Sequence, residues 1–284
     1  MAEGNNAYPK RIDKKKSPLI KTKYKIDNPS GKEKEKYHIP CLLLTNEISK
    51  FSKNFVIFFH GNAEDMFLSR IMALSLLQTL NMNIVIVEYP GYSIYKGSPN
   101  AEKILENTAI VYDFIKKKFN IEDKNIFIFG RSIGTSPAIY LASVRSPGGL
   151  FLVSSFTSIR AVAGNIVGPL KYLLKERFLS RDYIKNVKCP IYFIHGKSDP
   201  LIPYQETEEL KKLCTSFSDI KLPPHMTHND FDLENDIMKP IGKFVKDHCV
   251  VDREKCDIFN NKEEMDKLYK TPKEIYDFIE ENLK

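Results

Sequence analysis

Five short runs of apolar, β-favouring residues recur along the chain and constrain its fold more than any other feature. They are FVIFF (55–59), IVIV (84–87), IFIF (126–129), LFLV (150–153) and IYFI (191–194). Strands of this composition are buried on both faces, as in parallel sheets that helices cover. Successive runs start 29, 42, 24 and 41 residues apart, and helical patterns of apolar residues occur in the intervals. The spacing therefore predicts right-handed crossovers and an α/β fold with a mostly parallel central sheet and helices on both faces.

Two segments beside these runs leave alternatives open. The segment 37–44 (YHIPCLLL) has the composition of an extra strand ahead of the five, which could run antiparallel to them. The segment 156–187 is longer than a simple crossover and carries scattered apolar residues. It could form a small cap over the site or a helix packed on the sheet.

Positive charge is concentrated at one end of the chain, whose formal net charge is +7. Residues 1–36 hold 11 of the 43 Lys and Arg but only 5 of the 36 Asp and Glu, which leaves 32 basic against 31 acidic residues elsewhere. A nucleic-acid-binding domain gathers basic residues on a folded face, so this balance argues against nucleic acid as a partner. Residues 1–36 are expected to form a basic tail that is solvated, or that makes a weak contact with an acidic surface such as an anionic membrane.

The folded domain is expected to span residues 37–248 and to be followed by an amphipathic helical extension over 249–284. Two short stretches of the extension have apolar residues at helical spacing. The second stretch opens with a capping box, Thr271 and Glu274, and has Pro272 at its first helical position. Its apolar stripe would pack on the parent domain or on a protein partner.

The remaining composition bears on compartment and cofactors. No apolar run approaches the ~18 residues that cross a bilayer, and the N-terminus MAEGNNAYPK lacks the apolar segment of a signal peptide. Both features predict a cytoplasmic protein, at most peripheral to a membrane or an assembly. The cysteines are odd in number and include no CxxC, so they predict free thiols rather than disulfides or a zinc site. They are Cys41, Cys189, Cys214, Cys249 and Cys256.

The stretch IFIFGRSIGTSPAIYLAS (126–143) carries the strongest functional signal. A buried strand runs into Gly130-Arg131-Ser132-Ile133-Gly134 and then into a helix, which is the pattern of a nucleophile elbow. Such a turn strains the backbone of the serine, and glycines two residues either side avoid collisions with the neighbouring strand and helix. The turn would lift the Ser132 hydroxyl clear of the sheet, at the positive end of the helix.

A serine hydroxyl becomes a good nucleophile when a neutral imidazole takes its proton and an acid orients that imidazole. In this architecture the chain order is Ser, then Asp or Glu, then His. Asp199 follows the fifth apolar run in IHGKSDPLIP and is the predicted acid. His228 in THND, after a last strand near 219–224, is the predicted base, with His225 as the alternative. His248 falls in the last turn of a helix, where a solvated cation is the simpler interpretation.

The first apolar run ends in HGNA, where the second half of an oxyanion hole is expected. The main-chain N–H groups of Asn62 and Ile133 are the predicted donors to the negative charge of a tetrahedral intermediate. His60 and His195 are each the first residue of an HG pair and are interpreted as structural residues.

At these residues the chain resembles the α/β-hydrolase superfamily. Within it, the chain is similar to the bud-emergence-46-like serine hydrolases and to the group of alpha/beta hydrolase domain-containing protein 17, which are protein depalmitoylases. The resemblance covers about residues 37 to 247. It rests on FFHGNAED (58–65), EYPGYSIYKGSP (88–99), FGRSIGTSPAIYLAS (129–143), FIHGKSDPLIP (193–203) and HND (228–230). It implies the same site residues: Ser132, Asp199, His228, Asn62 and Ile133.

The sequence therefore predicts a serine hydrolase that cleaves a carboxylic ester or thioester, such as an acyl-protein or a lipid ester, through an acyl-enzyme. No metal or organic cofactor is implied. A long acyl group would fit if 156–187 forms an apolar lid. The alternative is a hydrolase fold that serves as a structural or binding component of a larger assembly, docking through residues 1–36 or 249–284.

Overall fold

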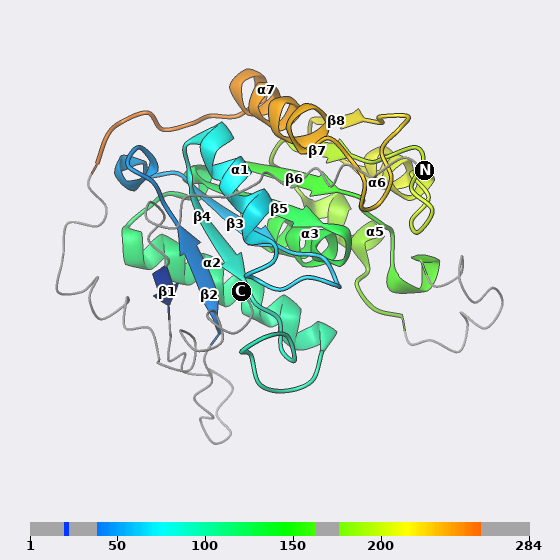
Figure 1. Cartoon of the computed structure of the whole chain (residues 1–284), viewed down its shortest axis with the longest axis horizontal. Coiled ribbons are helices and arrows are strands. Elements are labelled where there is room, and N and C mark those ends of the chain that lie inside the picture. Colours follow the sequence, from blue (N-terminus) through cyan, green and yellow to red (C-terminus); the bar gives the residue numbers. More distant parts are fainter. Residues whose placement is uncertain (1–19, 23–38, 163–175, 257–284) are drawn as a thin grey trace, which may run out of the picture.

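Eight strands form one sheet in the part of the chain that the structure, a computed structural model, describes: residues 20–22, 39–162 and 176–256 (Figure 1). Their order across the sheet is β1-β2-β4-β3-β5-β6-β7-β8. The strands are β1 (Ile20–Thr22), β2 (Cys41–Leu44), β3 (Phe55–Phe59), β4 (Asn83–Val87), β5 (Ile126–Arg131), β6 (Gly149–Val153), β7 (Ile191–Ile194) and β8 (Ser218–Lys221). Strands β3 to β8 run parallel, whereas β1 and β2 are antiparallel to their neighbours. The predicted mostly parallel sheet is confirmed.

Each of the five apolar runs forms a strand, from β3 to β7, because its residues are buried on both faces of the sheet. In β3, Phe55, Ile57 and Phe59 join the core on one face, and Val56 and Phe58 join the core on the other. All five side chains are inaccessible to solvent. This alternation is the two-residue period of a strand. It explains why the run contains no polar residue.

Helices cover both faces, as the spacing predicted (Figure 1). On one face lie α2 (Ala101–Phe119), α3 (Thr135–Val144), α5 (Ser180–Tyr183) and α6 (Gln205–Leu213); on the other lie α1 (Arg70–Leu80) and α7 (Lys239–His248). Helix α2 begins where the Asn100 side chain accepts a hydrogen bond from Lys103 N at 2.8 Å, and it ends at Asn120 in the left-handed region, with φ 48°. Both are common helix-end devices.

Short helical turns connect these elements. They are η1 (Ser49–Phe51), η2 (Asp123–Asn125), η3 (Ser132–Gly134), η5 (Ile184–Asn186) and the π-helical turn η6 (Leu233–Met238). Of these, η3 joins β5 directly to α3, so the strand passes into the helix with almost no loop. That junction is the predicted nucleophile elbow.

The antiparallel edge of the sheet differs in part from its prediction. The extra strand expected within 37–44 is β2, which pairs antiparallel with β4 from Cys41 opposite Val87 to Leu44 opposite Ile84. Beyond it, β1 pairs with β2, although Ile20–Thr22 lies inside the segment 1–36 that the charge pattern assigned to a tail. A strand of three residues with a single apolar side chain gives no periodic signal, and backbone hydrogen bonds at an open edge suffice to place it.

Several predicted features lie outside the described residues. These are most of the basic tail (1–19 and 23–38), the centre of the cap segment (163–175) and the two C-terminal helices (within 257–284). The first part of the predicted extension, residues 249–256, contains no helix and returns along the domain. There Cys256 N donates to Phe51 O at 2.8 Å, and Asn54 Nδ2 donates to Asp252 O at 2.6 Å.

The five cysteines are free thiols, as predicted, and Cys41 and Cys189 are buried. Within residues 20–22, 39–162 and 176–256, no helix combines the length and the apolar character needed to cross a bilayer.

The strand order reverses around β3, and this reversal fixes the place of the site. The chain leaves β3 for β4 on one side and then returns to β5 on the other. The loops after β3 and β5 therefore diverge at the carboxyl edge of the sheet. Ligands of open α/β sheets bind at such a switch point.

Candidate active site

Ser132 stands at the end of β5 in the strained backbone conformation that a nucleophile elbow requires. Its φ is 52°, in the left-handed region that residues with side chains rarely adopt. A Cβ atom at Gly130 would lie 2.5 Å from Gly134 O, and one at Gly134 would lie 2.3 Å from Phe59 O. Both flanking positions thus exclude any residue except glycine, for the steric reason that the sequence suggested.

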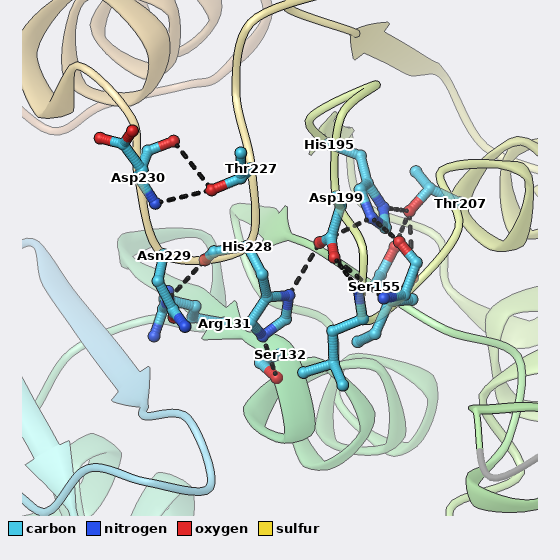
Figure 2. Close-up of polar contacts among 12 residues, drawn as sticks. Arg131, Ser132, Ser155, His195, Asp199, Thr207, Thr227, His228, Asn229 and Asp230 are labelled. Carbon is cyan, nitrogen blue, oxygen red and sulfur yellow. Dashed lines mark hydrogen bonds and ion pairs between the residues drawn. The ribbon is translucent and has the colours of Figure 1, made fainter. Parts of the chain in front are cut away.

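Ser132, His228 and Asp199 form a continuous chain of hydrogen bonds (Figure 2). The Nε2 atom of His228 lies 3.0 Å from Ser132 Oγ, and its Nδ1 atom lies 2.7 Å from Asp199 Oδ2. All three residues are buried, with exposed fractions below 10%: Ser132 8%, His228 7% and Asp199 9%. Since Asp199 Oδ2 can only accept when ionised, Nδ1 carries a proton and Nε2 faces the serine hydroxyl as an acceptor.

Asp199 is held in place by its own loop. Its Oδ1 atom accepts hydrogen bonds from Leu201 N at 2.8 Å and from Ile202 N at 2.9 Å. Its Oδ2 atom also lies 3.3 Å from His195 Nε2. Burial alone would raise the pKa of this carboxyl, but hydrogen bonds from His195, His228 and Ile202 N lower it well below its usual range. The ionised form of Asp199 is therefore favoured.

The loops that carry Asp199 and His228 pack directly on each other. A Cβ atom at Gly196 would lie 2.0 Å from Met226 O, and Ser198 N donates to that same carbonyl at 3.2 Å. A turn closed from Thr227 to Asp230 then carries His228. Thr227 N donates to Asp230 O at 2.9 Å, and Asp230 N donates to Thr227 Oγ1, also at 2.9 Å (Figure 2). The closeness of the β7 and β8 loops brings acid and imidazole together.

The other candidate histidines have different partners. His225 Nε2 lies 2.9 Å from Asp236 Oδ2, and 64% of the His225 side chain is exposed. It is therefore His228, and not the alternative His225, that reaches Ser132. His248 ends α7 and packs against Phe217 and Phe244. Neither His225 nor His248 contacts the elbow.

His60 and His195 are fully buried, in agreement with their interpretation as structural residues. The Nε2 atom of His60 lies 2.9 Å from Glu88 Oε1, and its Nδ1 atom lies 2.9 Å from Gly61 O. His195 lies behind Asp199, with Nδ1 2.6 Å from Thr207 Oγ1 and Nε2 2.9 Å from Ile202 O. Each histidine fixes a loop at the carboxyl edge of the sheet.

Asn62 and Ile133, the predicted oxyanion residues, line the same cavity beside the elbow. The Tyr92 hydroxyl donates to Asn62 Oδ1 at 2.6 Å, which fixes the Asn62 side chain over the loop after β4. The cavity has a volume of about 200 Å³, and its wall includes Tyr89, Ile104 and Phe178. An apolar group in this cavity would therefore lie next to both Asn62 and Ile133.

One residue of the site escaped prediction. Arg131 precedes Ser132 in the GRSIG motif, and its side chain is buried between the loops after β3 and β8. Its ion-pair partner, Glu64, lies 67 residues away in the sequence. The only sequence signal was a charged residue beside the predicted nucleophile.

Residues 20–22, 39–162 and 176–256 contain no group of three or more His, Cys, Asp or Glu side chains that could hold a metal ion.

The sheet order, the elbow and the buried Ser132–His228–Asp199 chain of hydrogen bonds define a protein of the α/β-hydrolase class. Comparison with known families is more specific: the Phospholipase/Carboxylesterase family model matches residues 72–249, and the chain belongs to that family.

Curated relatives and solved structures agree with this assignment. The alpha/beta hydrolase domain-containing protein aho-3 of Caenorhabditis elegans is 27% identical over 190 residues, which is 67% of this chain but 57% of the relative, so the chain spans little more than half of that protein. The human alpha/beta hydrolase domain-containing protein 17B is 26% identical over 75% of this chain and 72% of its own length. The predicted resemblance is confirmed. An esterase structure from Pyrococcus furiosus shares the fold, with a TM-score of 0.66 at 15% identity over 85% of this chain and 98% of that one.

Proposed function

We propose that the protein is a serine hydrolase that cleaves a carboxylic ester or thioester through an acyl-enzyme. The observation that carries the proposal is the buried chain of hydrogen bonds from Ser132 Oγ through His228 to Asp199, at 3.0 and 2.7 Å. Membership of the Phospholipase/Carboxylesterase family supports the same class of reaction.

In the acylation half, Ser132 Oγ attacks the carbonyl carbon of the substrate while His228 Nε2 takes the hydroxyl proton. The carbonyl oxygen becomes an oxyanion, which the N–H groups of Ile133 and Asn62 stabilise. The tetrahedral intermediate collapses, the bond to the leaving oxygen or sulfur breaks, and His228 gives its proton to that atom. An alcohol or a thiol leaves, and the acyl group stays on Ser132.

In the deacylation half, water takes the place of the departed alcohol or thiol. His228 accepts a proton from the water as its oxygen attacks the acyl carbon, and the same N–H groups stabilise the second oxyanion. When this intermediate collapses, His228 returns the proton to Ser132 Oγ. The products are a carboxylic acid and the free enzyme.

Asp199 has a supporting role in both halves. Its low pKa keeps it ionised, so it holds the Nδ1 proton of His228 and stabilises the imidazolium that forms in each transition state. The two backbone N–H groups on its other oxygen prevent the carboxylate from rotating away.

The cavity beside the oxyanion residues suggests the size of the acyl group. A cavity of ~150 Å³ holds benzene, or about six carbons, so about eight carbons fit in the roughly 200 Å³ found here. A palmitoyl group, which the resemblance to depalmitoylases would suggest, has twice that number of carbons and would extend beyond these walls. We therefore propose a short or medium acyl group as the preferred substrate.

The first experiment is labelling with a fluorophosphonate probe, which reacts with activated serines. The wild type should be labelled and Ser132→Ala should not. Ser136→Ala is the matched control, since Ser136 is a buried serine one turn further on, and its hydroxyl has no hydrogen-bond partner in the part of the chain that the structure describes. Labelling that persists in Ser132→Ala would contradict the assignment of the nucleophile.

The second experiment is a chain-length series of p-nitrophenyl esters, from acetate to palmitate. We expect kcat/KM to peak at about four to eight carbons and to fall for longer chains. A maximum at palmitate would refute the size limit while leaving the serine mechanism intact. Offering the best acyl group as a thioester then distinguishes the two leaving groups.

A further inference from the structure

Arg131, the residue immediately before Ser132, is buried between the two loops that complete the site. We call residues 61–65, after β3, the oxyanion loop, and residues 225–231, after β8, the histidine loop. Only 6% of Arg131 is exposed to solvent. A buried guanidinium is costly unless it is paired and hydrogen-bonded, so its partners show which elements it holds together.

One side of the guanidinium holds the histidine loop. Its Nη2 atom donates to His228 O at 2.7 Å and to Asn229 Oδ1 at 2.9 Å (Figure 2). The cation also lies over the Phe231 ring, 5.7 Å from its centre. The first of these bonds is made to the main chain of the very residue whose imidazole faces Ser132.

The other side holds the oxyanion loop. Its Nη1 atom forms an ion pair with Glu64 Oε1. Glu64 is itself bound to Gly61, because Gly61 N donates to Glu64 Oε2 at 3.4 Å and Glu64 N donates to Gly61 O at 3.3 Å. The guanidinium packs on the same glycine, since a Cβ atom there would lie 3.2 Å from Nη1. Arg131 therefore reaches the peptide that precedes Asn62.

We infer that Arg131 is a positioning residue: its guanidinium fixes the oxyanion loop and the histidine loop relative to Ser132. This inference rests on the proposed function and adds to it a residue that touches neither substrate nor reacting atoms. The planar fork of arginine can serve both loops at once, whereas the single ammonium of lysine cannot. Arginine is required at this point because the two acceptors lie on opposite sides of the guanidinium.

Loss of this alignment should slow the chemical steps more than it weakens substrate binding. Arg131 does not line the cavity proposed for the acyl group, so KM should change little. A misplacement of about 1 Å in a catalytic group can cost about 10²-fold in rate. We therefore expect kcat of Arg131→Met to fall by roughly 10²-fold, and Arg131→Lys to recover only part of it.

The test is kcat and KM for p-nitrophenyl butyrate, with kcat normalised to active sites counted by complete labelling with the fluorophosphonate probe. Arg145→Met is the matched control. Arg145 also makes a two-bond ion pair, to Asp113 at 2.8 and 2.6 Å, but it lies at the far end of α3. We expect Arg145→Met to keep the wild-type kcat. The inference would be overturned if Arg131→Met kept a kcat per active site within threefold of wild type and only its thermal midpoint fell. Arg131 would then have a purely structural role.

Glu64→Gln keeps the inference testable should Arg131→Met fail to fold. It removes the charge from the oxyanion-loop partner at almost constant size. If the two residues act as one link, Glu64→Gln should lower kcat in the wild type and have little further effect on Arg131→Lys. Independent, multiplicative effects would overturn the inference. A wild type without Ser132-dependent turnover would overturn the proposed function as well, so the two failures are distinguishable.

Discussion

Replacement of Asp199 by asparagine tests the proton path through the site more sharply than truncation does, because the structure fixes the orientation of the new side chain. In Asp199→Asn, one end of the amide must accept from Leu201 N and Ile202 N, at 2.8 and 2.9 Å. Only the amide oxygen can do so. The NH₂ group must then face His228 Nδ1, where the carboxylate now accepts at 2.7 Å.

The consequence is a change of tautomer. His228 Nδ1 would have to accept from the NH₂ group, so the ring proton would move to Nε2, which faces Ser132 Oγ at 3.0 Å. An imidazole protonated there cannot take the serine proton. The loss should be about 10⁴-fold in kcat, or about 5 kcal/mol in barrier height. In Asp199→Asn the same NH₂ group would also face His195 Nε2, which lies 3.3 Å from Asp199 Oδ2 in the wild type. A modest loss of stability should therefore accompany the loss of rate.

The assay is kcat for p-nitrophenyl butyrate, with circular dichroism to show that the variant is folded. Asp113→Asn serves as a control for the same chemical change at an exposed ion pair, and it should keep the wild-type kcat. A value for Asp199→Asn within tenfold of wild type would refute the tautomer argument. It would mean that Ser132 loses its proton by another route.

Three further predictions follow from the same contacts. Gly134→Ala should lower the free energy of unfolding in urea by about 1 to 3 kcal/mol, because its Cβ would lie 2.3 Å from Phe59 O and 2.6 Å from His60 O, both backbone atoms; an unchanged midpoint would contradict this. Tyr92→Phe removes an exposed hydrogen bond of 2.6 Å to Asn62 Oδ1, so kcat should fall about two- to fivefold. A kcat equal to that of the wild type would mean that this hydrogen bond is not needed to position Asn62. The pKa of Asp199 is lower in the folded protein than the value of about 3.9 for an unfolded carboxyl. Its contribution to stability is therefore complete above about pH 4 and decreases as pH falls toward the folded pKa. Urea titrations from pH 6 to pH 3 should show that the free energy of unfolding falls more in the wild type than in Asp199→Asn. Equal decreases in the two proteins would show that the folded state does not lower the pKa of Asp199.

Local sequence was sufficient for the parts of the fold that depend on burial. The runs that became β3 to β7 have no polar residue because both faces of a central strand are covered. The strand β1 was not predicted, since Ile20–Thr22 is held by pairing with β2 and shows no pattern of its own. The elbow was predictable for a similar reason: steric demands at Gly130 and Gly134 fix two residue types at a fixed spacing around Ser132.

The choice of histidine and the identity of Arg131 depend on tertiary contacts. His225 and His228 both follow β8, and the local sequence of each is compatible with a base that faces Ser132. Only the path of the histidine loop directs one ring to Asp236 and the other to Ser132. The role of Arg131 is harder still to predict from the sequence, because its partners Glu64 and Asn229 lie 67 and 98 residues away. A buried arginine and a solvated one have the same sequence signature.

The buried polar pairs of the site also share a geometric property: each joins residues at the carboxyl ends of two different strands. His60 and Glu88 join the loops after β3 and β4, Arg131 joins β5 to the oxyanion loop, and Asp199 and His228 join the loops after β7 and β8. Removing one partner of a buried ion pair leaves an unpaired charge, at a cost of about 3 to 5 kcal/mol, whereas replacing both partners costs far less. Each pair can therefore form only when the sheet has brought its strands into register. The alignment of Ser132 with its neighbours is then a consequence of sheet assembly. Substitutions of the two partners of one pair should have coupled effects on the rate, whereas substitutions in different pairs whose side chains do not touch should have independent effects.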